Sequence, residues 1–460
     1  MPLSRLSFLL AATLAAAAAA IPAAAQPAPG PAFPGAAGWA AETQGGRGGA
    51  IVRVTNLNAA GPGSFRAAVE TKGPRIVVFE VGGVIDLGRT TLSIEEPFLT
   101  IAGQTAPSPG ITIIRGGIDI KTHDVIMRHM RIHTGADGQA QRSGWEADAV
   151  STVGAHNVIV DHNTMIWAVD ENLSASGPRF TGSTPEEWRR GTSRNITFSY
   201  NILAEGLAYA SHPKGEHSKG SLIHDNASGI LIYRNLYAHN HERNPLLKGG
   251  AQAAVVNNFI YNPGAMAIHY NLMALEWGSQ PYQTGELSAV GNVLRGGPDT
   301  RGDIAFLAIG GAGDLRYHGR DNIAVDRMGK SVPMLGRYAT GKARIVESPS
   351  PVVWPRALDV LPADEVETHV LAFAGARPWN RDHQEIRITF DVAEGRGEII
   401  DDEREVGGFQ KVAPTRAPFR EAEWDLDTME PKSGRYPGQK DGYIQQPTTA
   451  RDRETRAAPR

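Results

Sequence analysis

Short runs of apolar and β-branched residues recur along most of the chain from Ile51 onward. Each run has about the length of a β-strand, and Gly, Asn, Asp or Pro stands at its ends, whereas long helical periodicity is scarce. The pattern predicts an all-β protein, either a repeat, a sandwich or a propeller. Typical runs are "AIVRVTNL", "RIVVFEVGG", "GITIIRGG", "NVIVDHNTM", "NITFSYNIL", "GILIYRNLY" and "AAVVNNFIY".

Asparagines near the ends of successive runs favour one of these architectures. Their spacing ranges from 23 to 38 residues, which fits one solenoid coil with or without a surface insertion. An Asn at the same bend of each coil can stack in a ladder of side-chain amides. We therefore predict a right-handed parallel β-helix rather than a sandwich; the alternative is that Asn is simply common at turns. The residues are Asn163, Asn201, Asn235, Asn258 and Asn292.

The beginning of the chain predicts export. Arg5 precedes an apolar run, and Ala23-Ala24-Ala25 supplies an A-x-A cleavage site, so residues 1–25 are interpreted as a signal peptide. A membrane anchor is the alternative, but the run is short and Ala is a weak membrane residue. We expect a secreted protein, extracellular or periplasmic, with no membrane association after cleavage.

Changes in composition divide the rest of the chain. Residues 26–45 are a leader rich in Pro, Ala and Gly, and 46–325 form the predicted β-helix domain. Residues 326–445 are expected to be a C-terminal extension that packs along the solenoid, with one helix in "PADEVETHVLAFAGARPWNRD". Residues 446–460 are polar and predicted to be disordered.

Charge and cysteine content exclude some classes of protein. The 46 Lys and Arg against 49 Asp and Glu give a net charge of −3, so a nucleic-acid-coating protein is excluded. There is no cysteine, so the fold cannot depend on disulfides. The 460 residues are enough to bury a core without them, and we expect a monomer.

Two acidic groups suggest a cation site. Glu146 and Asp148 in "GWEADAVS" can face one point if extended, and a solenoid stacks the coil carrying Asp161, Asp170 and Glu171 beside them. Convergent oxygen ligands suit Ca²⁺, whereas Zn²⁺ sites need His or Cys spacing that the chain lacks. The alternatives are solvated charges and, for Asp161, a local turn or cap.

Four cations follow the acidic groups. Lys214 and Lys219 lie in "HPKGEHSKGSL", and Arg243 and Lys248 lie in "ERNPLLKGG", each pair on an expected loop after a strand. Stacked coils bring the two loops together, so that a groove with Ca²⁺ and cations can hold an acidic polymer. Pro245 restrains the bend after Arg243. The alternative is that the lysines are solvated loop charges.

The histidines show no metal-binding spacing. We interpret them as turn or stacking residues. They include His156, His162, His212, His217, His224, His239 and His241.

From about Gly38 to Gly297 the chain resembles the pectate lyases of polysaccharide lyase family 1. The resemblance rests on "NVIVDHNTM", "AVDENLS", "HSKGSL", "IYRNLYAHNHERNPLLKGG" and "VVNNFIYN", together with the entry segment "GGRGGAIVRVTNLNAAGPGSFRAAVE". It implies a right-handed parallel β-helix and Ca²⁺-dependent β-elimination of α-1,4-linked polygalacturonate. It also implies an acidic polysaccharide as the partner.

The resemblance assigns roles to the cations. The catalytic arginine of the family motif R-x-P-x-x-R falls on Arg243, and the second basic position falls on Lys248, a departure from the motif. The substrate-binding lysine falls on Lys219, with Lys214 as the alternative. Arg243 is then the base that removes the C5 proton.

The resemblance also assigns the calcium ligands. They fall on Glu146, Asp148 and Asp170, but a further family carboxylate falls on Ser174, and Glu171 is expected to compensate. These departures leave room for other functions. The alternatives are a lyase for another uronate polymer, a hydrolase using paired carboxylates, and a non-catalytic carbohydrate-binding β-helix.

Overall fold

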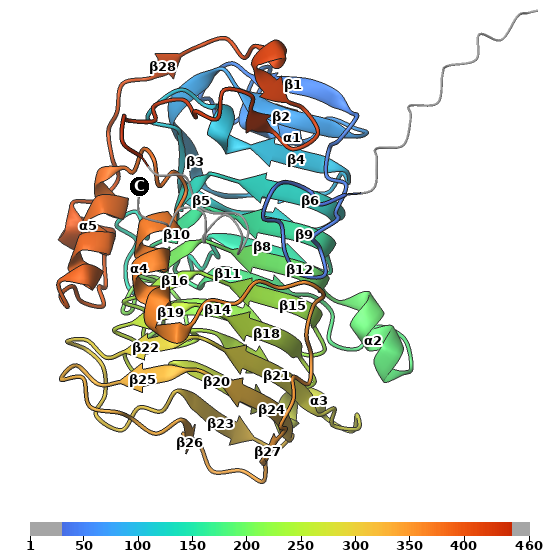
Figure 1. The fold of residues 1–460 in the computed structure, drawn as a ribbon, viewed down its shortest axis with the longest axis vertical. Helices are drawn as coiled ribbons and strands as arrows, with labels where there is room; N and C mark the ends of the chain where they lie inside the picture. Colours follow the sequence, from blue (N-terminus) through green and yellow to red (C-terminus); the bar gives the residue numbers. More distant parts are fainter. Residues whose placement is uncertain (1–29, 444–460) are drawn as a thin grey trace, which may run out of the picture.

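The computed structural model describes residues 30–443, and its strands wind into a parallel β-helix (Figure 1). The parallel β-helix predicted from the sequence is confirmed. The predicted signal peptide and the predicted disordered tail lie outside the described residues.

Three parallel ladders form the walls of the solenoid. In the first, which we call sheet 1, eleven strands pair in order. Sheet 1 consists of β1 (Ala50–Val54), β2 (Arg75–Phe79), β4 (Leu99–Ala102), β6 (His123–Arg128), β9 (His156–Asp161), β12 (Arg194–Ser199), β15 (Ser228–Tyr233), β18 (Gln252–Val256), β21 (Gly285–Val290), β24 (Leu315–Arg320) and β27 (Ile345–Glu347).

The other two ladders share their first strands, β3 (Val81–Ile94) and β5 (Ile111–Ile120), because β5 pairs with both β7 and β8. Sheet 2 consists of β7 (Arg131–His133), β10 (Thr164–Ile166), β13 (Ile202–Ala204), β16 (Leu236–Ala238), β19 (Phe259–Tyr261), β22 (Val293–Arg295) and β25 (Ile323–Val325). Sheet 3 consists of β8 (Val150–Val153), β11 (Glu171–Ser176), β14 (Lys219–Ile223), β17 (Leu246–Lys248), β20 (Ile268–Leu272), β23 (Leu307–Gly311) and β26 (Leu335–Arg337).

Apolar side chains stack in register inside the solenoid. Ile196 pairs with Val158 on one side and with Ile230 on the other, and Ile230 pairs in turn with Ala253. All four are fully buried. Alternation along each strand therefore repeats from coil to coil, and one continuous core results.

The asparagine ladder is confirmed and runs between sheets 1 and 2. The backbone N–H of each Asn donates to the side-chain oxygen of the next, with distances of 2.9 to 3.0 Å. Asn322, which the sequence pattern did not single out, extends the ladder by one coil. The ladder satisfies buried backbone groups at a bend where no strand pairing is available.

We expect Asn235→Ala to lower the free energy of unfolding by about 3 kcal/mol, because it leaves two buried backbone groups unpaired. Asn235 accepts from the N–H of Asn201 and donates to the carbonyl of Phe198, each at 2.9 Å. Equilibrium urea unfolding measures the change. Asn322→Ala, at the partly exposed end of the ladder, is the matched control and should cost about 1 kcal/mol. Equal losses in both variants would contradict the prediction.

Short helices lie within the coils, and two longer helices follow the last coil. α1 (Phe65–Val69), α2 (Pro185–Gly191) and α3 (Ala274–Trp277) lie between strands. One helix was predicted in the C-terminal segment, but the structure has two, α4 (Ala363–Phe373) and α5 (His383–Ala393). The first helix ends at Phe373, where Ala374 is extended and Gly375 has a positive φ of 104°, and a capping box of Asp382 and Glu385 starts the second.

The C-terminal segment runs back along the solenoid. Val366 and Val370 of α4 and Ile388 of α5 belong to the same buried cluster as Ile202 and Leu236 of sheet 2. Beyond the helices, β28 (Thr415–Arg416) pairs antiparallel with β3, and β29 (Trp424–Asp425) pairs with β30 (Glu430–Pro431). In Figure 1 these last strands lie beside the first coils.

Candidate active site

The site candidates gather where strands of sheet 3 begin. Asp148 precedes β8, Asp170 precedes β11, Glu171 opens β11, and Lys219 opens β14. Glu171 and Lys219 are paired in register, although they are 48 residues apart in the sequence. Arg243 lies three residues before β17, on the next coil.

The expectation that each pair of cations lies on a loop is wrong for two of the four residues. Lys219 is the first residue of β14, and Lys248 is the last residue of β17. Lys219 precedes a short apolar run and Lys248 follows one. In-register pairing with the neighbouring coils extends both strands to include the lysines. Strand pairing therefore fixes the backbone of both lysines.

Three carboxylates converge at the start of β8 and β11. One oxygen each from Asp148, Asp170 and Glu171 lies within 4.8 Å of the others. The backbone N–H of Glu171 donates to Asp148 Oδ1 at 3.1 Å, which orients that carboxylate. Burial, and then the neighbouring charge of Asp170, raise the pKa of Asp148 well above its ordinary value. Crowded carboxylates of this kind offer hard oxygen donors, so these residues fit Ca²⁺.

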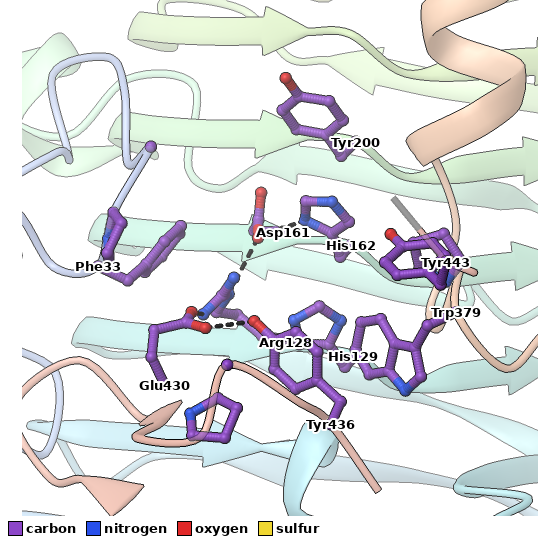
Figure 2. Close-up of a pocket in the computed structure, with 15 residues that line it drawn as sticks. Phe33, Arg128, His129, Asp161, His162, Tyr200, Trp379, Glu430, Tyr436 and Tyr443 are labelled. Atoms are coloured by element: carbon purple, nitrogen blue, oxygen red, sulfur yellow. Dashed lines mark hydrogen bonds and ion pairs between the residues drawn. The ribbon is translucent and has the colours of Figure 1, made fainter. Parts of the chain in front are cut away.

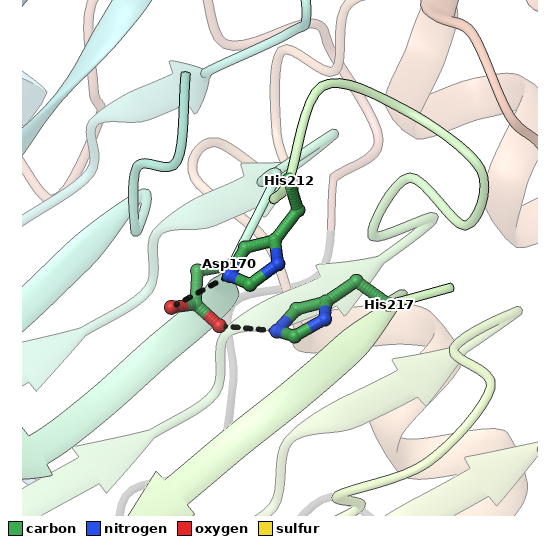
Figure 3. Close-up of side chains that lie close together, drawn as sticks. All are labelled: Asp170, His212 and His217. Carbon is green, nitrogen blue, oxygen red and sulfur yellow. Dashed lines mark hydrogen bonds and ion pairs between the residues drawn. The ribbon is translucent and has the colours of Figure 1, made fainter. Parts of the chain in front are cut away.

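Glu146 lies at the edge of this group beside His212, and Figure 3 shows His212 and His217 facing Asp170. The carboxylate Oε2 of Glu146 is 3.1 Å from His212 Nε2, and its side chain is half exposed. His217 Nε2 is 2.7 Å from Asp170 Oδ1, and His212 Nε2 is 3.6 Å from Asp170 Oδ2. The two imidazole rings stack with their centres 3.5 Å apart. Three of the four predicted acidic residues are therefore brought together, and Glu146 is linked to them through His212.

His212 and His217 are site residues that the sequence did not reveal as such. The N–H of Lys214 donates to His212 Nδ1 at 3.2 Å, so the neutral ring carries its proton on Nε2, the atom that faces Glu146 and Asp170. Burial lowers the pKa of His212, with the neighbouring His217 adding to the effect. The trio of Asp170 and both imidazoles could also hold a metal ion, but this tautomer favours donors that orient Asp170. In the sequence, the position of His217 two residues before the predicted substrate-binding Lys219 was the one indication that it could belong to the site.

Arg243 faces the carboxylates from the next coil. Its guanidinium forms an ion pair with Glu171, and its Nε lies 4.0 Å from Glu242 Oε1. Its backbone is in the left-handed region, with φ of 63°, which turns the side chain at the bend before Pro245. Burial lowers the pKa of Arg243, although the charges of Asp170 and Asp148 oppose the effect.

Lys219 lies beside Arg243, and its ammonium group contacts Glu242. The lysine side chain is only 6% exposed. Burial acts to raise the pKa of Glu242, but Lys219, His269 and His241 together lower it below its ordinary value. Arg243 and Lys219 therefore meet the acidic group on adjoining coils, with Glu242 between the two cations.

The other two predicted cations have different surroundings. Lys248 belongs to a separate buried network, because its ammonium group contacts Glu276 and lies 4.0 Å from Asp225 Oδ2. Arg179 completes that network with contacts to both carboxylates, at 2.9 and 3.0 Å. Lys214 is exposed on the loop before His217. The surroundings of Lys248 do not follow from sequence spacing, since its counter-ions come from the two adjoining coils.

Asp161, the fifth acidic candidate, is not part of the group. It ends β9 at another corner of the solenoid, where its Oδ2 lies 3.0 Å from Arg128 Nε and 2.7 Å from His162 Nδ1. Figure 2 shows these residues lining a cavity of about 280 Å³, together with Trp379 and Tyr436. The expectation that its coil stacks beside Glu146 and Asp148 holds for the backbone, but Asp161 ends a strand of sheet 1, away from sheet 3.

The chain is similar in sequence to known proteins over most of its length. No model of a known protein family matches the chain. A protein named probable pectate lyase C from Aspergillus flavus is 32% identical over 380 residues, covering 82% of this chain and 81% of the relative. The protein of the same name from Aspergillus terreus is 32% identical over 389 residues, covering 82% and 81%.

A solved structure supports the fold. The crystal structure of Jun a 1, the major allergen from cedar pollen, aligns with a TM-score of 0.52 at 16% identity. The alignment covers 74% of this chain and 92% of the allergen. At this identity the likeness extends to the fold alone.

Proposed function

Because the chain belongs to the pectate lyase family and is thus a polysaccharide lyase, we propose that it cleaves α-1,4-linked polygalacturonate by Ca²⁺-dependent β-elimination. The products would be 4,5-unsaturated oligogalacturonides. The observation that carries the proposal is the meeting of Arg243 and Lys219 with Asp148, Asp170 and Glu171 on adjoining coils of one sheet. A basic group, a second cation and a set of hard oxygen donors are the parts that this reaction needs.

The removal of a weakly acidic proton explains the arrangement. Removal of the C5 proton of a uronate by the base puts negative charge on the adjacent carboxylate, and Lys219 is placed to stabilise that charge. The C4–O4 bond then breaks as the C4=C5 double bond forms, and the departing O4 takes a proton from water. Arg243 is the proposed base, since burial favours its neutral form. Asp148, Asp170 and Glu171, with Glu146 at the edge, are the proposed ligands of Ca²⁺. When bound, the ion supplies further positive charge for the same developing anion.

The remaining cations are proposed to bind neighbouring uronates along the chain. Lys214 is exposed and free to reach a flexible polymer. Lys248 must exchange Glu276 for a substrate carboxylate before it can do so. We further propose that residues 1–25 direct export and that the mature enzyme is a monomer. Among residues 30–443, the helices are all too short or too polar to cross a membrane.

Ultraviolet absorbance during incubation with polygalacturonate tests the proposal. We expect absorbance to rise with added Ca²⁺ and to stay flat with a chelator, because only β-elimination creates the unsaturated uronide. New reducing ends without absorbance would instead indicate a hydrolase. Absorbance with another uronate polymer but not with polygalacturonate would contradict the substrate and favour a lyase of different specificity.

Activity is expected to rise with pH. The pKa of Arg243 is lowered by burial, yet an arginine remains mostly protonated at neutral pH. Raising the pH toward that lowered pKa increases the neutral fraction, so kcat/KM should increase between about pH 7 and pH 10. Initial rates at saturating Ca²⁺ measure the profile. A profile that falls throughout this range would contradict Arg243 as the base.

A further inference from the structure

The carboxylate of Glu171 lies between the proposed cation ligands and Arg243. On one side, its carboxylate lies within 4.8 Å of oxygens from Asp148 and Asp170, the proposed cation ligands. On the other side, it forms the ion pair with Arg243, the proposed base. Its side chain is 5% exposed, so water contributes little to its solvation. A buried carboxylate needs a cationic partner, and the structure pairs this one with Arg243.

The same carboxylate is also needed for the cation. Ser174, three residues along β11, is buried and offers a hydroxyl rather than a further carboxylate. Two aspartates alone leave a calcium site poor in charge, and the number of charged ligands sets its affinity. In the part of the chain that the structure describes, Glu171 is the third carboxylate with an oxygen within 4.8 Å of those of Asp148 and Asp170, whereas Glu146 lies at the edge and is half exposed. Arg243 and the cation therefore require the same side chain.

We propose that Glu171 exchanges partners, pairing with Arg243 when the cation site is empty and joining Asp148 and Asp170 when Ca²⁺ is bound. This rests on the proposed function, and it adds a coupling between cation binding and the freeing of Arg243. A divalent ion attracts the carboxylate about twice as strongly as a guanidinium at equal distance, which drives the exchange.

Through this exchange, cation binding at the carboxylates and substrate binding at Arg243 affect each other. Once Glu171 turns to the cation, Arg243 loses its contact ion pair, keeps Glu242 Oε1 at 4.0 Å from its Nε, and becomes available to substrate. Before that, a substrate has to displace Glu171 from Arg243. By thermodynamic reciprocity, Arg243 must in turn weaken Ca²⁺ binding through its hold on Glu171.

Isothermal titration of the full-length chain with CaCl₂ tests this without measuring turnover. Four proteins form a double-mutant cycle: the unaltered chain, Glu171→Gln, Arg243→Gln, and the combination. We expect Arg243→Gln alone to tighten Ca²⁺ binding about tenfold, because Glu171 is released. In the Glu171→Gln background the same change should tighten binding no more than about twofold, the through-space effect of removing a positive charge.

Lys219→Gln is the matched control, since it removes a neighbouring cation that pairs with Glu242 rather than Glu171. It should tighten Ca²⁺ binding to the same small extent in both backgrounds. Circular dichroism and thermal unfolding confirm that each variant is folded. Equal tightening by Arg243→Gln in both backgrounds would overturn the exchange while leaving the Ca²⁺ site in place. Failure of the unaltered chain to bind Ca²⁺ would overturn the exchange and the proposed cofactor together.

Discussion

Arg243→Lys is expected to lower kcat on polygalacturonate by about 10²- to 10⁴-fold, the usual contribution of a general base. Lysine keeps the positive charge, so binding of the acidic polymer should change little. Its shorter, single-point ammonium cannot reproduce the reach of the guanidinium from the bend before Pro245. Initial rates from ultraviolet absorbance at several substrate concentrations separate kcat from KM.

The comparison with a remote arginine makes this result specific. Arg316 lies on β24 of sheet 1, half exposed and paired with Glu286 at 2.7 Å. Arg316→Lys should leave kcat within about twofold of the unaltered enzyme, since exposed ion pairs contribute little. Nearly full activity in Arg243→Lys would show that Arg243 is a binding cation and that the base lies elsewhere.

Asp170→Asn is expected to weaken Ca²⁺ binding by about 100-fold or more. The change is isosteric but removes one of the charges that set the affinity of a calcium site. Asp170 is also the carboxylate that His217 contacts at 2.7 Å, and this hydrogen bond helps to lower its pKa against the effect of burial. Asn keeps an acceptor for His217, so loss of affinity would report the charge rather than the packing.

Calcium titration measures the affinity, and activity at raised Ca²⁺ provides a second measurement. Activity lost at low Ca²⁺ should return in part as the concentration increases, because the remaining carboxylates still bind the ion. Asp314→Asn, at an outer coil where Asp314 pairs with Arg344 at 2.7 Å, is the control and should bind Ca²⁺ unchanged. Unaltered Ca²⁺ affinity in Asp170→Asn would remove Asp170 from the proposed ligand set.

Residue patterns were enough to predict the architecture because a solenoid repeats its local rules. Each coil needs apolar residues on the inner face and a polar residue at each bend, so the same signal appears many times. The ladder from Asn163 to Asn292 was predicted on that basis, and the structure confirms it. The second C-terminal helix was missed, because α5 is rich in β-branched residues and occurs only once.

The sequence by itself determined the parallel β-helix, the family, and the set of charged residues from which the site is built. Only the tertiary structure decided which charges meet: Glu171 with Arg243, Glu242 with Lys219, and His217 with Asp170, whereas Asp161 joins Arg128 at another corner. Loops of variable length separate the coils, so sequence distance does not reveal which residues lie side by side. Register between stacked strands sets those neighbours, and register is a property of the folded chain as a whole.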